Sequence, residues 1–384
     1  MKNILFFSLL IFGFNIYTAQ AQSILQFPVN YLSNAANAWT SVLSDFGISG
    51  EIATYVKNNQ SAASVGYIDA ISTLAFNTSA ISLFEINHHV NQAFSVIAEP
   101  IISRRNTCVK NLPDCTQKDK RIVLSGDVFG AFADYDSDKN GSFKTRNTGF
   151  SVNAKSFITD GWEIGIGYTR SMTDTEDSNV YTDAVSNSIT LFSEYLAKNG
   201  FFMNVGLNAG HTSWTADKNF AGISNNSAYD TDFIAGQTNA GVRIQGRKIS
   251  FIPQMGVKYM RVMADKYTDD ATQEFDDWWY NYLTGFAGMT LGFDFIAEGL
   301  LIRPVLTAGG SYDAISNGTD NIRVQLINSS VYNIPIESPD RMSLNAGAGI
   351  EVYGENFVVG ASYRLDYREN YTANTATINL KIAF

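Results

Sequence analysis

The chain has 384 residues, enough for one large core or two domains, and a formal net charge of −10. This acidic balance, without a long run of lysines or arginines, argues against a nucleic-acid partner. The chain carries few charges for its length but is rich in Tyr, Phe and Gly.

The N-terminus predicts a secretory signal peptide over residues 1–21. Lys2 supplies a basic start, residues 4–14 are apolar, and an Ala-Gln-Ala cleavage site ends at Ala21. Because the apolar run is too short to span a bilayer, we expect cleavage near Ala21; an uncleaved anchor is the alternative. An exported chain without another long apolar helix is either a soluble secreted protein or a transmembrane β-barrel.

The next segment has helical character. Residues 22–80 are rich in Ala, Ser, Asn and Ile with broken helical periodicity, which indicates a short helical passenger-like or linker region. Pro100 should kink the following helix or mark a join, and Arg104 and Arg105 suit a helix C-terminus, where the dipole is negative. From Ile81 onward, apolar residues at helical spacing form one amphipathic stripe: Leu83, Ile86, Val90, Phe94, Ile97 and Ile101.

Two residue pairs in this region are candidates for a covalent or metal site. Cys108 and Cys115 are the only cysteines, and in an oxidising compartment we expect them to close a small disulfide loop; a metal pair is the alternative. His88 and His89 are adjacent, so on a helix their side chains diverge by about 100° and make a poor metal pair.

From residue 121 to residue 384 the hydrophobic period changes to two, which predicts β-strands. In GFFMNVGLNAG, from Gly200, Met203, Val205 and Leu207 share one face while Asn and Gly occupy the other. WEIGIGYTR, MSLNAGAGIEV and the C-terminal TINLKIAF alternate in the same way. This pattern favours a barrel with lipid outside and a polar lumen. A soluble β-sandwich also alternates, but it should bury its bulkier residues.

Short and long connections take turns along this part of the chain. Tight periplasmic turns and longer outside loops are typical of outer-membrane barrels. The pattern gives about twelve strands, an even number that places both barrel ends on the periplasmic side. Short turns are expected at 159–161, 198–200, 246–248, 297–299 and 354–356, and longer polar links at 136–142, 173–183, 215–228, 264–275, 314–340 and 369–371.

The first long link has the start of a calcium motif. From Asp136 it reads D-S-D-K-N-G, like an EF-hand loop, but Asn147 stands where the bidentate Glu is needed and the flanks alternate as strands. We therefore predict a hairpin loop, with weak cation binding by Asp134, Asp136 and Asp138 as the remaining metal hypothesis. No cofactor is expected.

His211 and Ser213 offer a catalytic alternative. Two residues apart on a strand, they share a face, and by parity with Leu207 that face is outward. A lipid hydrolase would use Ser213 as nucleophile and His211 as base, but the sequence does not identify a third residue that orients the histidine. The other interpretation is that both residues meet lipid headgroups, with Trp214 in the aromatic belt.

The later links are acidic, notably between Asp265 and Asp277. Charge runs of this kind usually form a solvated face, and partner binding is the alternative. An aromatic cluster follows and is assigned to the interfacial girdle: Trp278, Trp279, Tyr280 and Tyr282.

From about residue 81 onward the sequence resembles the C-terminal translocator domain of autotransporters, the type V secretion family. FIPQMGVKYMRV, from Phe251, is similar to the family's P-x-x-G-x-x-Y strand, and SNSITLFSEYLAKNGFFMNVGLNAGH, from Ser186, to its central hairpin. The last strand is similar to the signal by which barrel proteins are recognised for assembly, here carried by Ile378, Leu380, Ile382 and Phe384.

The resemblance implies a helix through the pore. Residues 81–120 would supply this pore helix and a cysteine loop near the periplasmic mouth, and residues 121–384 the barrel. A soluble helix packing elsewhere is the alternative. Family passengers are typically long β-helices, for which residues 22–80 are too short. The implied pore-helix residues are Glu85, His88, Val90, Phe94, Ile97, Arg104 and Arg105, with one of the two adjacent histidines facing the lumen.

The expected fold is therefore all-β: a roughly 12-stranded antiparallel outer-membrane β-barrel with an N-terminal helical segment threading the pore. Its expected function is to export or display its own short N-terminal segment, without catalytic residues. An adhesin or structural component acting through acidic loops, and a lipid hydrolase, are the alternatives. We expect a monomer in a Gram-negative outer membrane, with lipid, lipopolysaccharide and the barrel assembly machinery as partners and the loops open to an extracellular partner.

Overall fold

The computed structural model describes one helix and a set of β-strands. The predicted signal peptide, residues 22–80 and both cysteines lie outside the described residues. Among the described residues, no helix is long and apolar enough to cross a bilayer. The described ranges are 81–95, 122–137, 141–159, 161–176, 180–220, 223–269, 273–319, 321–326, 331–335, 340–354 and 356–384.

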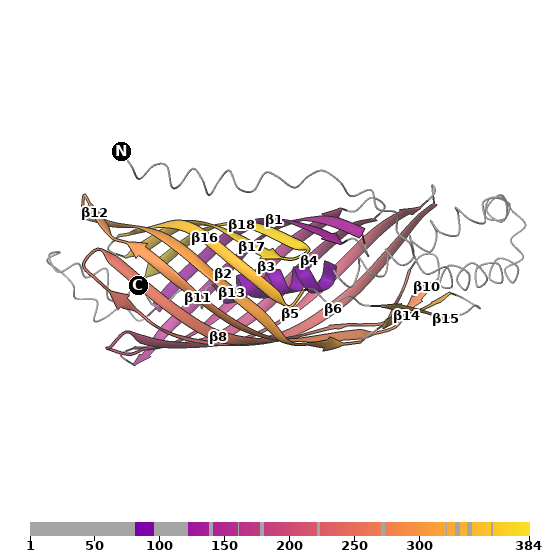
Figure 1. Cartoon of the computed structure of the whole chain (residues 1–384), viewed down its shortest axis with the longest axis horizontal. Coiled ribbons are helices and arrows are strands. Elements are labelled where there is room, and N and C mark those ends of the chain that lie inside the picture. Colours follow the sequence, from indigo (N-terminus) through magenta and orange to yellow (C-terminus); the bar gives the residue numbers. More distant parts are fainter. Residues whose placement is uncertain are drawn as a thin grey trace, which may run out of the picture. The chain divides into compact units, whose positions relative to one another are not determined.

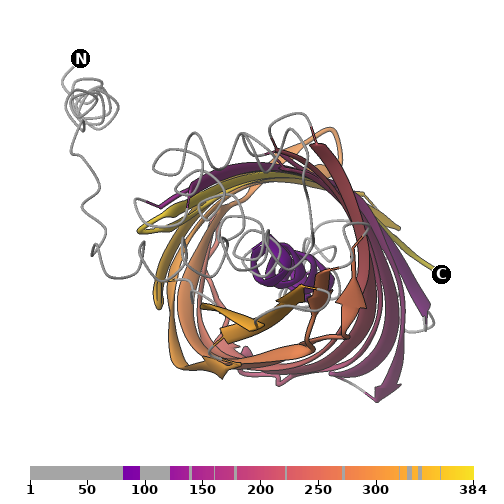
Figure 2. The ribbon, with the colours of Figure 1, turned by 90° about the vertical axis from the view of Figure 1, so that its right-hand side faces the viewer.

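Twelve long antiparallel strands form the wall of a closed barrel. Each strand pairs with its neighbours in chain order, and β1 pairs with β18 to complete the ring, with Val123 opposite Ala383. Figure 1 shows the tilted strands from the side, and Figure 2 shows them from one end as a ring. The wall strands are β1 (Ile122–Ser137), β2 (Gly141–Thr159), β3 (Trp162–Glu176), β4 (Val180–Leu196), β5 (Phe201–Phe220), β6 (Ile223–Val242), β8 (Ile249–Ala264), β11 (Trp278–Phe293), β13 (Leu300–Gly318), β16 (Met342–Tyr353), β17 (Phe357–Arg368) and β18 (Tyr371–Ala383).

The tight turns gather at one end of the barrel, named here the turn end. Gly161, Gly200 and Gly299 adopt positive φ angles of 89°, 91° and 80°, a backbone region that glycine enters without steric cost. Two short strands, β7 (Ile244–Gln245) and β12 (Phe295–Ala297), extend the hairpins there. Both β1 and β18 have their barrel termini at this end, as the alternation of short and long connections predicted.

The longer connections gather at the opposite end, named here the loop end. The predicted links at 264–275 and 314–340 are not merely loops, because they contribute strands to a separate four-stranded sheet. Figure 1 shows β10, β14 and β15 of this sheet at the end away from β12. Its strands are β9 (Tyr267–Thr268), β10 (Gln273–Phe275), β14 (Asn321–Leu326) and β15 (Val331–Pro335).

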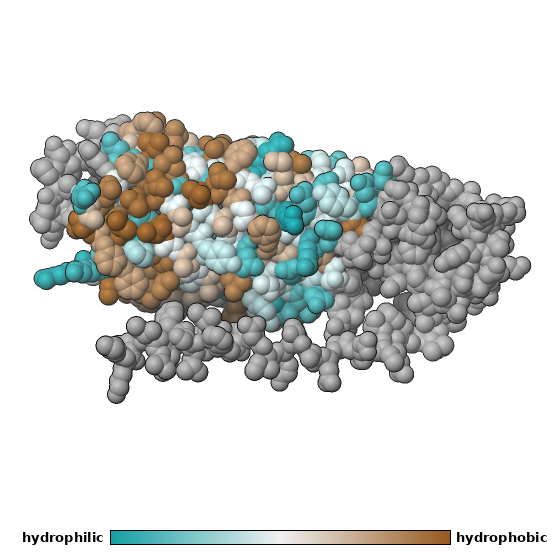
Figure 3. Space-filling model, turned by 90° about the horizontal axis from the view of Figure 1, so that it is seen from above, coloured by the Kyte–Doolittle hydropathy of each residue, from teal (hydrophilic) through white to brown (hydrophobic). Residues whose placement is uncertain are grey.

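The outward face of the barrel is apolar over the half nearer the turn end. On β5 the outward side chains Met203, Val205 and Leu207 are exposed, while Phe202 and Asn204, which alternate with them, are buried in the lumen. Hydrophobic side chains gather over the part of the surface nearer the turn end (Figure 3). The period-two alternation therefore separates a lipid-facing surface from a polar interior, as predicted.

The strands differ in length by more than the bilayer requires. A tilted strand needs about 9–11 residues to span the hydrocarbon core. β16 and β17 have 12 residues each, whereas β5 and β6 have 20 residues each. The surplus of β5 and β6 carries polar outward residues and projects beyond the apolar band at the loop end.

Candidate functional site: the helix inside the lumen

Residues 81–95 form an α-helix inside the ring of strands, named here the lumen helix (Figure 2). The segment contains neither Gly nor Pro, so nothing in it interrupts the helix. The predicted stripe is buried at Leu83, Ile86, Val90 and Phe94. The polar residues between them are also enclosed by the barrel, and enclosed polar groups need hydrogen-bond partners.

Aromatic side chains hold the N-terminal turn of the lumen helix at the loop end. The ring of Phe84 stacks on Tyr371 with 4.6 Å between centroids and lies 5.2 Å from Tyr135. Phe143 meets the same ring edge-on at 6.1 Å. These three partners come from β18, β1 and β2, close to the loops that join those strands. The helix is thus fixed at the loop end by strands from both termini of the barrel.

A column of stacked aromatic rings joins the wall to the small sheet. Trp214 stacks on Tyr229 at 5.7 Å, Tyr229 on Tyr267 at 4.8 Å, and Tyr267 on Phe275 at 4.5 Å. The placement of Trp214 in the outer aromatic belt is therefore wrong. Trp214 has the opposite parity to His211 and Ser213 and points inward, where 1% of its surface is exposed.

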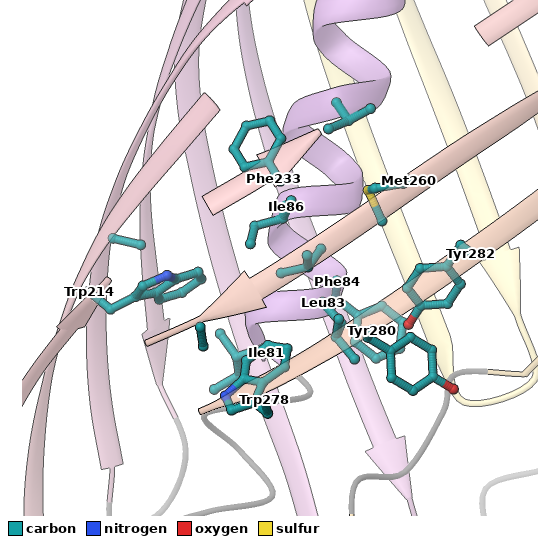
Figure 4. Close-up of a cluster of buried hydrophobic side chains, with 14 of the residues drawn as sticks. Ile81, Leu83, Phe84, Ile86, Trp214, Phe233, Met260, Trp278, Tyr280 and Tyr282 are labelled. Carbon is teal, nitrogen blue, oxygen red and sulfur yellow. The ribbon is translucent and has the colours of Figure 1, made fainter. Parts of the chain in front are cut away.

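The assignment of the cluster at the start of β11 to the interfacial girdle is also wrong for most of its members. Trp278, Tyr280 and Tyr282 are buried and pack with the lumen helix (Figure 4). Trp279, of opposite parity, is the member that faces outward, and Arg261 lies over its ring at 5.0 Å. An acidic run followed by aromatic residues does not show whether those side chains face the lumen or the lipid. The position of each residue in the alternation along the strand does.

Glu85 is the buried charge of the helix. Its two carboxylate oxygens accept bonds from the Thr145 hydroxyl at 2.8 Å, the Asn147 amide at 3.2 Å and the Thr173 hydroxyl at 3.1 Å. These donors belong to β2 and β3 near the loop end. Hydrogen bonds to an ionised group are about twice as strong as neutral ones, so this contact fixes the helix in register against the wall.

One turn farther along, His89 makes the second polar contact with the same wall. Its Nδ1 lies 2.7 Å from the Ser171 hydroxyl and its Nε2 lies 2.8 Å from the Ser188 hydroxyl. Both ring nitrogens are thus satisfied although the side chain is fully buried. His88 is also buried and lies edge-on to Phe129 at 6.5 Å between centroids. Both histidines, and not just one, are therefore enclosed in the barrel.

A single lysine contacts the other side of the helix. The Nζ of Lys258, on β8, donates to the Asn87 and Asn91 side-chain oxygens at 2.7 Å each. The two asparagines are four residues apart, so their side chains lie one above the other on the same helix face. Lys258 thereby bridges two successive turns of the lumen helix.

Beyond Lys258, the residues that the structure describes leave part of the lumen open. A cavity of about 390 Å³ lies between the helix and the wall formed by β8, β11, β13, β16 and β17. Small polar side chains line it, including Thr307, Ser343 and Ser362, together with charged groups from β17. Arg364 pairs with Asp366 at 2.6 Å, and Arg368 pairs with Asp313 at 2.8 Å. A polar cavity of this size holds water.

The helix has a defined direction along the barrel axis. Its N-terminal residue pair, Ile81 and Ser82, lies at the loop end, where the Ser82 hydroxyl is 3.1 Å from that of Tyr229. Its last described turn, at Phe94 and Ser95, lines the cavity with Ile252, which is nearer the turn end. The lumen helix therefore runs from the loop end towards the turn end.

Ionic networks line the lumen near the turn end. Lys155 on β2 lies 3.0 Å from Glu163 on β3 and 3.1 Å from Glu194 on β4, and both carboxylates are buried. Across the barrel, Arg303 on β13 donates from Nε to Asp294 at 2.6 Å. In these two networks the buried charges are paired with opposite charges within bonding distance, which offsets the cost of burying them.

Comparison with known proteins identifies the family to which this barrel belongs. A model of the autotransporter beta-domain matches residues 124–364. The chain belongs to the autotransporter beta-domain family. It is an outer-membrane autotransporter barrel. Among curated proteins, no sequence match was found.

Solved autotransporter barrels share the fold at low sequence identity. The translocator domain of NalP from Neisseria meningitidis is 11% identical, with a TM-score of 0.64 over 82% of this chain and 99% of that one. The beta domain of the Bordetella autotransporter BrkA is 13% identical, with a TM-score of 0.54 over 69% and 100%. The transport unit of AIDA-I from Escherichia coli is 13% identical, with a TM-score of 0.50 over 73% and 97%.

The other predicted site residues that the structure describes lie at the last strand and at the first hairpin of this autotransporter barrel. Ile378, Leu380 and Phe384 lie exposed on the outward face of the last strand, and Ile382 is half-buried there. Asp134 and Asp136 lie exposed at the first hairpin, where Asp134 is 3.8 Å from Lys144. The predicted sites that lie outside the described residues are Ile97, Arg104, Arg105, Cys108, Cys115 and Asp138.

His211 and Ser213 lie together on the outward face of β5, with 3.3 Å between His211 Nε2 and Ser213 Oγ. The structure supplies the orienting partner that the sequence did not identify, because Asp232 on β6 lies 2.8 Å from His211 Nδ1.

The main lumen residues that sequence reasoning missed are Thr145, Asn147, Thr173 and Lys258. The alternation along each strand predicts that these side chains face the lumen. Which turn of the helix each one contacts depends on the depth of the helix in the barrel, which the sequence does not give.

Proposed function

We propose that this barrel carries the residues before its lumen helix across the outer membrane and displays them at the cell surface. The direction of the helix carries the proposal. Its N-terminal turn lies at the loop end, beside Tyr229, so the helix begins on the side of the long loops. In an outer-membrane barrel the long loops face outside.

The contacts between the lumen helix and the barrel wall support a segment that remains in the pore after export. Glu85, Asn87, His89 and Asn91 all bond to inward side chains of the wall, so these four side chains have their partners at one particular depth of the helix. Shifting the helix by one turn would leave these buried groups without partners, at about 1–3 kcal/mol for each group. Export of this kind uses no catalytic residues.

The same proposal includes how the chain reaches its place. Residues 1–21 would direct export and be removed near Ala21, leaving residues 22–80 as a short displayed segment. The outward side chains of the last strand, Ile378, Leu380, Ile382 and Phe384, would be read by the barrel assembly machinery. Lipid and lipopolysaccharide would cover the apolar band of a monomeric barrel.

Epitope tags on intact cells test the proposal. One tag would be inserted after Asn58, ahead of the lumen helix, one between Asp177 and Asn179 in a loop, and one after Asn199 in a turn. We expect the first two tags to bind antibody on intact cells, and the third to bind only after the outer membrane is opened. If the tag after Asn58 behaves like the turn tag while the loop tag is exposed, display is refuted.

A second candidate function is partner binding at the loop end, and the small sheet favours it. Two long links fold together into this sheet instead of forming separate loops. Lys266 lies 2.7 Å from Glu274, and Arg323 lies 3.6 Å from Asp276. The hydrogen bond to Glu274 raises the pKa of the Lys266 ammonium. Replacing residues 327–330 by Gly-Ser and measuring cell adhesion would test this function, which an unchanged adhesion would contradict.

A further inference from the structure

The outward faces of β5 and β6 carry a Ser, a His and two Asp residues in contact with one another. Ser213 Oγ lies 3.3 Å from His211 Nε2, and Asp232 Oδ1 lies 2.8 Å from His211 Nδ1. Asp230 Oδ1 lies 3.4 Å from Nε2. The strand register explains the contacts, because His211 is directly opposite Asp232 and Ser213 is directly opposite Asp230.

The contacts assign the hydrogen-bonding roles of the imidazole. A carboxylate only accepts hydrogen bonds, and Asp232 at 2.8 Å is closer to Nδ1 than Asp230 at 3.4 Å is to Nε2, so the proton of neutral His211 sits on Nδ1 and is donated to Asp232. Nε2 then carries the lone pair and accepts from the Ser213 hydroxyl. This is the arrangement in which a histidine acts as general base towards a serine nucleophile while a carboxylate fixes its tautomer.

The position of the cluster along the strand points to a substrate. The apolar outward residues of β5 run from Phe201 to Ala209, and His211 and Ser213 follow directly. At about 3.4 Å of rise per residue and a strand tilt of about 40°, they lie about 5 and 10 Å beyond Ala209 along the barrel axis. That is the interfacial layer, where acyl chains are joined to their headgroups.

We propose that Ser213, His211 and Asp232 form an outward-facing hydrolytic site for acyl esters of membrane amphiphiles. The activity is additional to export and does not depend on it. It revises the sequence-based expectation of a barrel without catalytic residues, and it rests on the orienting Asp232 that β6 supplies.

The reaction is an ordinary two-step acyl transfer. Ser213 Oγ bonds to the ester carbonyl carbon as its proton passes to His211 Nε2, and the carbonyl oxygen becomes an oxyanion. The ester C–O bond then breaks, and the His211 proton goes to the departing alcohol. Water attacks the acyl-serine with His211 again as base, which releases the fatty acid and restores the serine hydroxyl.

Asn187 on β4 is placed to donate to the oxyanion. It lies directly opposite His211, and so diagonally across from Ser213, whose own opposite residue is Val185. Diagonal neighbours are about 7–8 Å apart, which leaves room for a carbonyl group between hydroxyl and amide. The Tyr168 hydroxyl donates to Asn187 Oδ1 at 2.7 Å and orients the amide.

Asp230 has a separate role. Its contact with Nε2 is attractive when that nitrogen is protonated, which happens after the serine proton has been transferred. Asp230 and Asp232 together therefore stabilise the imidazolium that forms during the reaction, one at each ring nitrogen. The side chains of His211, Asp230 and Asp232 are about half exposed, so the surrounding lipid would have to exclude water from the site.

Hydrolysis by the purified full-length chain, refolded in detergent, tests the site. Three substrates distinguish the source of the ester: para-nitrophenyl hexanoate in micelles, phosphatidylcholine vesicles, and purified lipopolysaccharide. We expect turnover of at least one of them, with a loss of about 100-fold or more in both Ser213→Ala and His211→Ala. Thr215→Ala, which removes the next outward hydroxyl of β5, is the matched control and should keep the wild-type rate.

Asp232 is a positioning residue and needs its own readout. We expect Asp232→Asn to lower kcat by about 100-fold or more while KM stays unchanged, and Asp232→Glu to restore part of kcat. Asn187→Ala should lower kcat by about 100-fold. Heat-modifiable migration in gels establishes that each variant has folded.

Two results would overturn the proposal. One is a folded wild-type chain that hydrolyses all three substrates no faster than Ser213→Ala. The other is a Thr215→Ala variant that loses as much activity as Ser213→Ala, which would make the loss a general effect of outward hydroxyls. Neither result bears on export, which the epitope tags measure independently.

Discussion

The lumen helix lies between two unlike walls. On one side β2, β3 and β4 meet it with short polar side chains that bond directly to Glu85 and His89. On the other side β8 reaches it through the long side chain of Lys258, and a cavity of about 390 Å³ separates it from β13, β16 and β17. The first is named here the packed wall and the second the open wall.

The difference shows how a barrel can hold a helix without being filled by it. Direct contacts on the packed wall set the depth and rotation of the helix, whereas the open wall leaves room for water. Substitutions of the same kind should therefore have unequal effects on the two sides. Four predictions test how the helix is held, with the largest expected effect first.

Phe84→Ala should have the largest effect. The ring packs against Tyr371, Tyr135 and Phe143 at the loop end, and removing a buried Phe costs about 3–5 kcal/mol. Urea unfolding of the refolded barrel, followed by tryptophan fluorescence, would measure the loss. Phe132→Ala, an outward residue of β1 with 62% of its surface exposed, is the control and should cost far less. Equal losses would mean that Phe84 does not fix the helix.

Glu85→Ala should come second. It removes the acceptor of three hydrogen bonds and leaves the buried Thr145, Asn147 and Thr173 donors without their partner, at about 3 kcal/mol. The same unfolding experiment applies, with Glu85→Gln as the matched variant that keeps the volume and loses the charge. We expect Glu85→Gln to lose about half as much. A Glu85→Ala barrel as stable as the wild type would show that the packed wall does not hold the helix.

Replacing a small side chain by a large one should show the difference between the two walls most clearly. Ser188→Phe on the packed wall displaces the His89 contact and overfills the space between β4 and the helix, at about 1–3 kcal/mol. Ser362→Phe, the same change on the open wall, enters the cavity and should stay within about 0.5 kcal/mol. Protease protection of the helix in the refolded barrel should fall for the first variant and not for the second. Equal effects would remove the distinction between the walls.

Lys258→Met should have the smallest effect of the four. The substitution keeps most of the side-chain length and removes two hydrogen bonds to Asn87 and Asn91. Because water in the adjoining cavity can bond to both amide oxygens instead, the loss should be about 1 kcal/mol. A loss as large as that of Glu85→Ala, measured by the same urea unfolding, would show that the open wall contributes equally to helix docking.

Much of the fold could be predicted from the sequence because a transmembrane barrel repeats a local pattern. Alternation in β5 separated Leu207 from Asn208, and the positive-φ turns coincide with Gly161, Gly200 and Gly299. Near the loop end the local pattern gives the wrong face. Aromatic residues near strand ends usually face lipid, which predicts Trp214 and Trp278 outside, but both are buried in the lumen, as the parity of their strands requires.

The site was less predictable because it joins elements far apart in the chain. Glu85 was predicted to belong to the pore helix, but its partners Thr145 and Thr173 depend on the depth of the helix in the barrel. Likewise, Asp232 becomes the partner of His211 only once the register of β5 and β6 is known. Composition and hydrophobic period determine which face of a strand is buried. The register between neighbouring strands determines which side chains come into contact.

Thiol labelling inside the lumen tests the two-wall account most directly. Single cysteines at Ser188 and at Ser362 would be made in a chain carrying Cys108→Ser and Cys115→Ser. A small water-soluble thiol reagent would then be added to the refolded barrel. We predict fast labelling at 362, which lines the cavity, and slow labelling at 188, which the helix covers. Equal labelling rates at the two positions would contradict a helix held against the packed wall.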